Sequence, residues 1–171
     1  AALFEKTSSK LWDKNMDVLS KGCFLISREV YQNMMTQDQG GSIIFISSKN
    51  SLNASKGASA YSVAKSSLLH LSRSIALEGS VYKIRSNVVN PDAVIQNSKI
   101  WSGGWKKQRA DGNKISINKV EEFYKNRSLL KVSILPQDIA EGVYFFASSK
   151  SKKSTGNILN VDGGNITSFT R

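Results

Sequence analysis

The chain has 171 residues, of which 40% are hydrophobic and 22% are charged, a balance that is typical of one globular domain and excludes collagen-like and disordered chains. Its 24 basic residues against 13 acidic ones give a net charge of +11, but the basic residues are not interleaved with the aromatic side chains that stack nucleic-acid bases. No apolar run approaches the roughly 20 residues that span a bilayer, so we expect a soluble, cytoplasmic protein with neither a nucleic-acid nor a membrane partner.

Apolar residues recur at three- and four-residue steps from residue 10 to about residue 35, which predicts a long helix. The polar residues 36–41 end this helix, and the sequence Ser-Ile-Ile-Phe-Ile-Ser-Ser at 42–48 predicts a short strand buried on both faces. Residues 58–78 again show a helical pattern, with apolar positions on more than one face. We expect one face to cover the sheet and the other to meet a partner subunit in a homo-oligomer.

Residues 84–90 predict a second strand, which Pro91 ends. The following residues, 92–118, contain three glycines and two tryptophans but no sustained period. This composition predicts a long loop or lid with short helical pieces.

Two helices are predicted at 120–126 and 136–147, and the second opens with Pro136 and the acidic Asp138, which suit a helix amino terminus. A third strand is expected at 157–161. The order of helices and strands predicts an α/β fold in which helices flank three parallel strands.

Cysteine and histidine occur once each, as Cys23 and His70. One cysteine cannot form an internal disulfide, and the two side chains cannot assemble a zinc site, so no metal site is expected. Two basic runs are interpreted as solvated surface. They are Lys106, Lys107 and Arg109, and Lys150, Lys152 and Lys153.

The side chains that could carry chemistry follow the first predicted strand. Ligands of open parallel sheets bind beyond the carboxyl ends of the strands, where Ser47 and Ser48 are expected, and Tyr61 and Lys65 share one face of the next helix. A phenol with a pKa of about 10 is a poor base at neutral pH, but a nearby ammonium favours the phenolate. Tyr61 could then exchange a proton with a substrate oxygen that Ser48 hydrogen-bonds. The spacing alone also fits an exposed helical face.

Four motifs together resemble the short-chain dehydrogenase/reductase family. They read Gly-Gly-Ser-Ile-Ile-Phe-Ile-Ser-Ser, Ala-Tyr-Ser-Val-Ala-Lys, Ile-Arg-Ser-Asn-Val-Val-Asn-Pro and Ser-Thr-Gly-Asn-Ile-Leu-Asn-Val-Asp-Gly-Gly. The resemblance implies a Rossmann-like, doubly wound sheet and an oxidoreductase that uses NAD or NADP. It also implies that Ser48, with Ser47 as the alternative, polarises the substrate oxygen. Tyr61 is then the acid/base, and Lys65 lowers the pKa of Tyr61 and holds the nicotinamide ribose.

The segment after the second strand lines the nicotinamide in this family, which implies that Pro91, Asp92 and Val94 bind the cofactor. Two residues depart from the family pattern. Asp92 replaces the usual glycine, and Leu19 replaces an asparagine that helps hold a water of the proton relay. The usual construction of that relay is therefore in doubt, whereas the catalytic trio is unaffected.

The glycine-rich turn with which the family binds pyrophosphate has no counterpart in the sequence. None of the glycine pairs at 40–41, 103–104 and 163–164 opens a helix after a strand. We therefore expect residues 1–171 to be one partial domain, the carboxyl-terminal, active-site half, which lacks the nucleotide-binding half and is inactive alone. The choice between NAD and NADP would lie in the other half.

A narrower pattern in residues 89–105 and 130–141 resembles the dehydrogenase part of bifunctional rhamnulose-1-phosphate aldolase/alcohol dehydrogenases. It implies an upstream aldolase domain in the parent chain and the oxidation of L-lactaldehyde, or a similar small hydroxyaldehyde or alcohol, in rhamnose catabolism. Trp101 and Trp105 would then close a lid over the substrate, or else anchor the lid to the core. The competing hypothesis is a catalytically silent module that oligomerises and binds an anionic partner.

Overall fold

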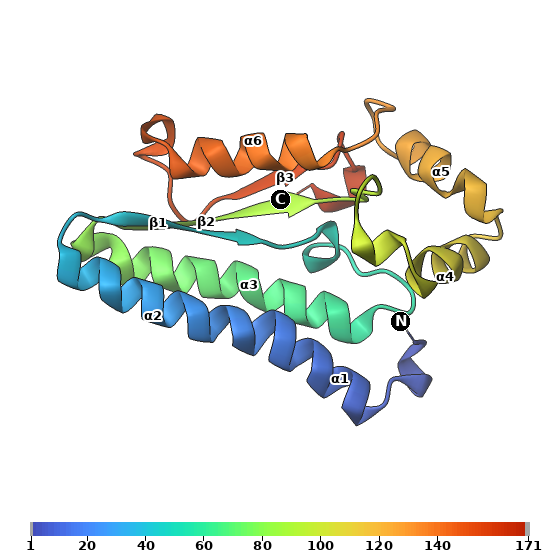
Figure 1. Cartoon of the computed structure of the whole chain (residues 1–171), viewed down its shortest axis with the longest axis horizontal. Coiled ribbons are helices and arrows are strands. Elements are labelled where there is room, and N and C mark those ends of the chain that lie inside the picture. Colours follow the sequence, from blue (N-terminus) through green and yellow to red (C-terminus); the bar gives the residue numbers. More distant parts are fainter. Residues whose placement is uncertain (1, 170–171) are drawn as a thin grey trace.

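The computed structural model describes residues 2–169 and contains a three-stranded parallel sheet between two layers of helices (Figure 1). The strands β1 (Gly41–Ile46), β2 (Ile84–Pro91) and β3 (Ile158–Val161) lie in that order across the sheet. Both neighbouring pairs are parallel, with Ile43 beside Ser86 in one of them. The predicted α/β fold with three parallel strands is therefore confirmed.

Helices α2 (Gly22–Gln37) and α3 (Ser59–Glu78) cover one face of the sheet, and α6 (Pro136–Ala147) covers the other (Figure 1). The carboxylate of Asp138 accepts the Leu135 N–H at 2.8 Å, which caps the start of α6 as its sequence predicts. The main core lies between α3 and the sheet. Its buried members are Ile43, Phe45, Leu68, Leu69, Ile84 and Val88.

The long first helix is continuous from Ser9 to Gln37 but is not regular. It consists of α1 (Ser9–Asn15), a π-helical segment (Met16–Lys21) and α2. Each π turn contains an extra residue, which the mixed three- and four-residue spacing of the sequence did not reveal. The half-buried Leu19 lies in this π segment.

The second face of α3 contacts α1 and the π segment of the same chain. One hydrogen bond of this contact runs from the Ser67 hydroxyl to the Ser20 hydroxyl, at 2.7 Å. The expected partner face is thus covered in part by the chain itself. Exposed apolar side chains gather on α2 instead: Phe24, Leu25, Ile26 and Val30.

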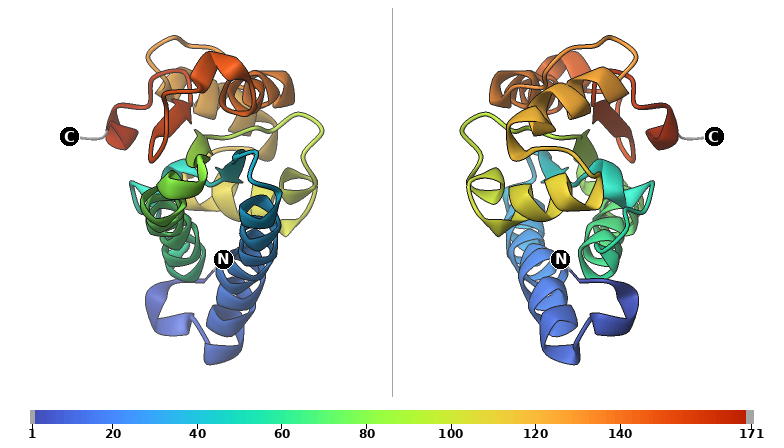
Figure 2. Two further views of the ribbon diagram at one scale, coloured as in Figure 1. Left: turned by 90° about the vertical axis from the view of Figure 1, so that its left-hand side faces the viewer. Right: turned by 90° about the vertical axis from the view of Figure 1, so that its right-hand side faces the viewer.

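The lid predicted at 92–118 contains two 3-10 turns and the nine-residue helix α4 (Gly104–Gly112), and α5 (Val120–Arg127) follows it. It lies beyond the carboxyl ends of the strands (Figure 2). Trp101, Ala110 and Val120 form a small buried cluster of its own. The predicted long loop with short helical pieces is therefore confirmed.

The lone Cys23 is half-buried against the main core, and His70 is exposed. Within residues 2–169, no three histidine, cysteine or acidic side chains gather in a way that could hold a metal ion. No helix of that span is long and apolar enough to cross a bilayer.

Candidate active site

A cavity of about 440 Å³ lies beyond the carboxyl ends of β1 and β2, where open parallel sheets bind ligands. Its volume falls in the range of about 300–1,000 Å³ that is usual for small-molecule sites. Eight of the residues predicted from the sequence, counting the alternative Ser47, line it: Ser47, Ser48, Tyr61, Pro91, Asp92, Val94, Trp101 and Trp105. Lys65, the remaining one, lies outside this lining, one helical turn after Tyr61.

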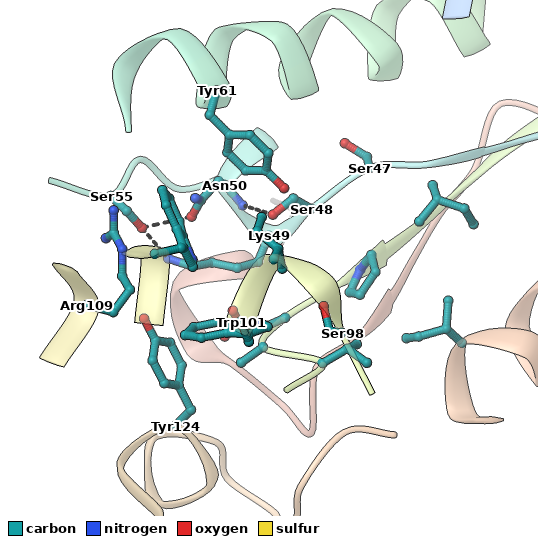
Figure 3. Close-up of a pocket in the computed structure, with 18 of the residues that line it drawn as sticks. Ser47, Ser48, Lys49, Asn50, Ser55, Tyr61, Ser98, Trp101, Arg109 and Tyr124 are labelled. Carbon is teal, nitrogen blue, oxygen red and sulfur yellow. Dashed lines mark hydrogen bonds between the residues drawn. The ribbon is translucent and has the colours of Figure 1, made fainter. Parts of the chain in front are cut away.

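The two serines after β1 are oriented differently, and β1 ends at Ile46, two residues earlier than predicted. The buried Ser47 donates its hydroxyl proton to the Lys65 carbonyl at 2.9 Å and so ties the end of β1 to α3. Ser48 is half-buried, accepts the Asn50 N–H at 3.2 Å and faces the Tyr61 hydroxyl (Figure 3). Of the two alternatives, the geometry favours Ser48.

The Tyr61 phenol reaches the cavity from the first turn of α3. Burial raises the pKa of this phenol, the neighbouring Ser48 hydroxyl lowers it, and the negative charge of Asp92 raises it further. The net direction is upward, so the phenol keeps its proton at neutral pH. Lys65 is not among the groups that act on this phenol here, so its lowering of the pKa of Tyr61 stays a prediction.

The Lys65 ammonium instead donates to the Ile46 carbonyl at 2.8 Å. Burial lowers the pKa of this lysine. An ammonium has three protons, and the bond to Ile46 uses one of them. Two donors therefore remain for hydroxyl groups of a ligand.

Asp92 fits its unusual position because its charge is compensated. The carboxylate accepts bonds from the Arg127 guanidinium and, at 2.8 Å, from the Asn165 amide. The left-handed backbone conformation of this turn falls on the next residue, Ala93, with φ of 49°. A side chain at position 92 is therefore tolerated without strain.

The two tryptophans of the lid have different surroundings. Trp101 is 9% exposed and packs edge-on against Tyr124, with ring centroids 5.2 Å apart. Trp105 approaches the ring of Tyr61, at a centroid distance of 6.1 Å. Trp101 thus anchors the lid while lining the cavity, and Trp105 lies beside the candidate catalytic phenol.

Lys49 is a cavity residue that we did not predict. It is only 6% exposed, and its ammonium donates to the Ser55 hydroxyl at 3.0 Å. The Ser55 hydroxyl in turn donates to the side-chain oxygen of Asn50 at 2.8 Å. All three line the cavity, and the position of Lys49 immediately after Ser48 was the available signal.

The interpretation of Arg109 as part of a solvated surface is wrong. It lines the cavity, and its guanidinium lies 4.2 Å from the centroid of the Trp105 ring. One of its terminal nitrogens donates to the Lys56 carbonyl at 3.3 Å, and its Nε is buried without a partner. Lys107 of the same run is exposed, as are the three lysines of the second run. Sequence spacing could not show that α4 turns Arg109 inward.

Comparison with known proteins supports the family that the sequence motifs indicate. A family model described as "Enoyl-(Acyl carrier protein) reductase" matches residues 1–165. An oxidoreductase of the short-chain dehydrogenase/reductase family from Burkholderia thailandensis has the same fold, with a TM-score of 0.83 and 28% identity over 97% of this chain. The chain belongs to this family. Its short-chain dehydrogenase fold is also seen in sorbitol-6-phosphate 2-dehydrogenase SrlD from Erwinia amylovora, with a TM-score of 0.90 and 31% identity over 96% of the chain.

A relative by sequence is the uncharacterized oxidoreductase YuxG of Bacillus subtilis, which is 49% identical over 168 residues and 98% of this chain. The chain spans only 24% of YuxG, 64% of SrlD and 60% of the Burkholderia protein. Each of these three proteins therefore extends beyond the part that the chain matches.

Proposed function

We propose that the protein is a nicotinamide-dependent oxidoreductase that interconverts a small alcohol and its carbonyl compound. The observation that carries this proposal is the meeting of the Ser48 and Tyr61 hydroxyls in one cavity beyond the carboxyl ends of the sheet (Figure 3). The family membership of the chain supports it.

The residues present fit the nicotinamide end of NAD or NADP. The Lys65 ammonium has two free protons for ribose hydroxyls, and Pro91, Asp92 and Val94 line the cavity beside the end of β2. Two proteins of the same fold support this choice, a 4-hydroxyisoleucine dehydrogenase complexed with NADH and ElxO with NADP bound. When bound, the nicotinamide supplies or accepts the hydride. We propose that the nucleotide-binding half of a longer parent protein holds the rest of the dinucleotide.

The chain's own residues handle the proton and orient the substrate. In carbonyl reduction Ser48 donates a hydrogen bond to the substrate oxygen, and Tyr61 gives that oxygen its phenolic proton. In alcohol oxidation the proton moves the other way, from the substrate hydroxyl to the phenolate of Tyr61. Trp101 and Trp105 line the cavity and help to exclude water from the reacting atoms.

For the substrate we propose a small hydroxyaldehyde or alcohol, with L-lactaldehyde of rhamnose catabolism as the first candidate. Its support is the sequence pattern of residues 89–105 and 130–141. The length of YuxG, of which this chain spans 24%, leaves room for an aldolase domain in that relative. SrlD acts, by its name, on sorbitol 6-phosphate, which makes a phosphorylated polyol the second candidate.

The test measures nicotinamide absorbance with the full-length protein, with NAD and NADP, and with L-lactaldehyde and sorbitol 6-phosphate as substrates. We expect turnover with at least one combination and, in Tyr61→Phe, a loss of kcat by a factor of about 10² to 10⁴, because general acid–base catalysis contributes that much. Tyr144→Phe is the matched control, since Tyr144 is 61% exposed on α6. Absence of turnover, or full activity of Tyr61→Phe, would contradict the proposal.

A further inference from the structure

Two cationic side chains from distant parts of the chain meet at one side of the active-site cavity. Lys49 comes from the loop after β1, and Arg109 comes from α4 in the lid. Figure 3 shows both beside Ser55, whereas the Ser48 and Tyr61 hydroxyls face each other elsewhere in the cavity. The two hydroxyls and the two cations would therefore contact different parts of one bound molecule.

The partners of these cations are few. The Lys49 ammonium, in a residue that is 6% exposed, donates among the described residues only to the neutral Ser55 hydroxyl. The Nε of Arg109 is buried without a partner. Within residues 2–169, no carboxylate lies within 4 Å of either cation. Burial of a cation is costly unless an opposite charge compensates it.

The acidic side chain that lines the cavity does not provide this compensation. Asp92 forms its ion pair with Arg127 and accepts a further bond from Asn165. Burial lowers the pKa of Lys49, and the more distant charge of Asp92 opposes that effect only in part. Lys49 and Arg109 thus line the cavity together with one carboxylate, whose charge Arg127 already balances, so the cavity has an excess of positive charge.

A purely structural role for Lys49 explains less of this arrangement. The loop needs a donor to the Ser55 hydroxyl, and a neutral side chain could supply it without the cost of a buried charge. Nor would such a role account for the unpartnered Nε of Arg109. A guanidinium and an ammonium together are a common combination for binding phosphate or carboxylate oxygens.

We propose that Lys49 and Arg109 bind an anionic group of the substrate, a phosphate or a carboxylate, while Ser48 and Tyr61 act on a hydroxyl or carbonyl elsewhere in the same molecule. This inference rests on the proposed function and reverses the order of its two substrate candidates, because it favours a phosphorylated polyol. A neutral hydroxyaldehyde such as L-lactaldehyde leaves both cations without an anionic partner, so it is expected to be the poorer substrate.

The experiment compares neutral, phosphorylated and carboxylated forms of one polyol with the full-length protein. One series is sorbitol, sorbitol 6-phosphate and gluconate, and a shorter one is glycerol, glycerol 3-phosphate and glycerate, with L-lactaldehyde as a further neutral substrate. We expect kcat/KM to favour an anionic form by about 10-fold to 100-fold, the usual range for a charge-assisted hydrogen bond. The better of the two anions identifies the group that is bound.

Three variants assign the preference to residues. Lys49→Met and Arg109→Met remove one cation each at similar side-chain length and are expected to reduce the anionic preference by about 10-fold or more. Lys107→Met is the matched control, because Lys107 is exposed on the same helix as Arg109 and does not line the cavity. Its preference should equal that of the wild type. If Lys49→Met does not fold, the anionic preference of Arg109→Met tests the proposal by itself.

A second readout does not depend on turnover. The rise in melting temperature on addition of each compound is measured for the same proteins, and the anionic forms should stabilise the wild type and Lys107→Met more than the two cavity variants. Turnover without an anionic preference, or a preference that both cavity variants retain, overturns this inference and leaves the proposed function intact. Absence of turnover, together with stabilisation that depends on Lys49 and Arg109, overturns the proposed function and leaves the anion site.

Discussion

Burial is the main influence on the pKa of Tyr61 and raises it, while the Lys65 ammonium donates to the Ile46 carbonyl. The phenol therefore keeps its proton at neutral pH, which suits a proton donor in carbonyl reduction. Alcohol oxidation requires the phenolate, so its rate should increase as the pH rises toward the pKa of Tyr61.

This direction can be measured on the chain without substrate. Ionised tyrosines absorb in the near ultraviolet, and the difference between the titrations of the wild type and Tyr61→Phe isolates one phenol. We expect that phenol to ionise above pH 10, because burial disfavours its charged form. The exposed Tyr144, isolated in the same way from Tyr144→Phe, gives the reference. Ionisation of Tyr61 below that of Tyr144 would mean that a cation such as Lys65 lies closer to the phenol than the structure shows.

The elements are held together by close contacts that local periodicity does not specify. Helix α6 approaches the sheet at Gly142, where a Cβ would lie 3.2 Å from Leu159 Cδ2 of β3 and 3.5 Å from Val89 Cγ1 of β2. The absent side chain thus permits α6 to cover this face. The neighbouring side chains leave little room for a larger residue.

We expect Gly142→Val to lower the free energy of unfolding by about 1–3 kcal/mol, because added methyl groups overpack a filled interface. Chemical denaturation of both proteins measures the difference. Glu141→Val is the control, since Glu141 is exposed one position earlier and reports the helix propensity of valine without the clash. Equal stabilities of the two variants would show that α6 can move away from β3 at little cost.

At the scale of the whole molecule, α2 exposes several apolar side chains close together along one helix. Ile26 is 70% exposed, and Phe24, Leu25 and Val30 on the same helix are 37% to 43% exposed. Apolar side chains that gather on one surface often mark an interface between subunits. We therefore propose that the expected homo-oligomer forms through α2 more than through α3.

Ile26→Glu tests this proposal, because a carboxylate buried in an apolar interface disfavours association. Light scattering should give the mass of an oligomer for the wild type and a smaller mass for the variant at the same concentration. Val81→Glu is the control, since Val81 is 77% exposed but lies outside α2. A wild type of single-chain mass, or an unchanged mass of Ile26→Glu, would contradict the assignment of the interface.

Much of the fold and part of the candidate site could be predicted from the sequence. Strand and helix patterns depend on residues close in sequence, so three parallel strands, the lid and helix α6 were identified. Both serines follow the first strand, so the preference for Ser48 came from the family resemblance, as did the role of Tyr61 in the first turn of the next helix. Strand ends and the π segment were missed, because small shifts in backbone hydrogen bonding leave the pattern of apolar residues nearly unchanged.

The sequence by itself determined which elements form and which hydroxyls lie at the end of the first strand, because both follow from local spacing. Only the tertiary structure decided that Lys65 bonds Ile46, that Ser47 is tied to α3, and that Lys49 and Arg109 share a cavity. Lys49 and Arg109 belong to elements far apart in the chain. Their meeting depends on how the lid packs over the sheet, which no local pattern encodes.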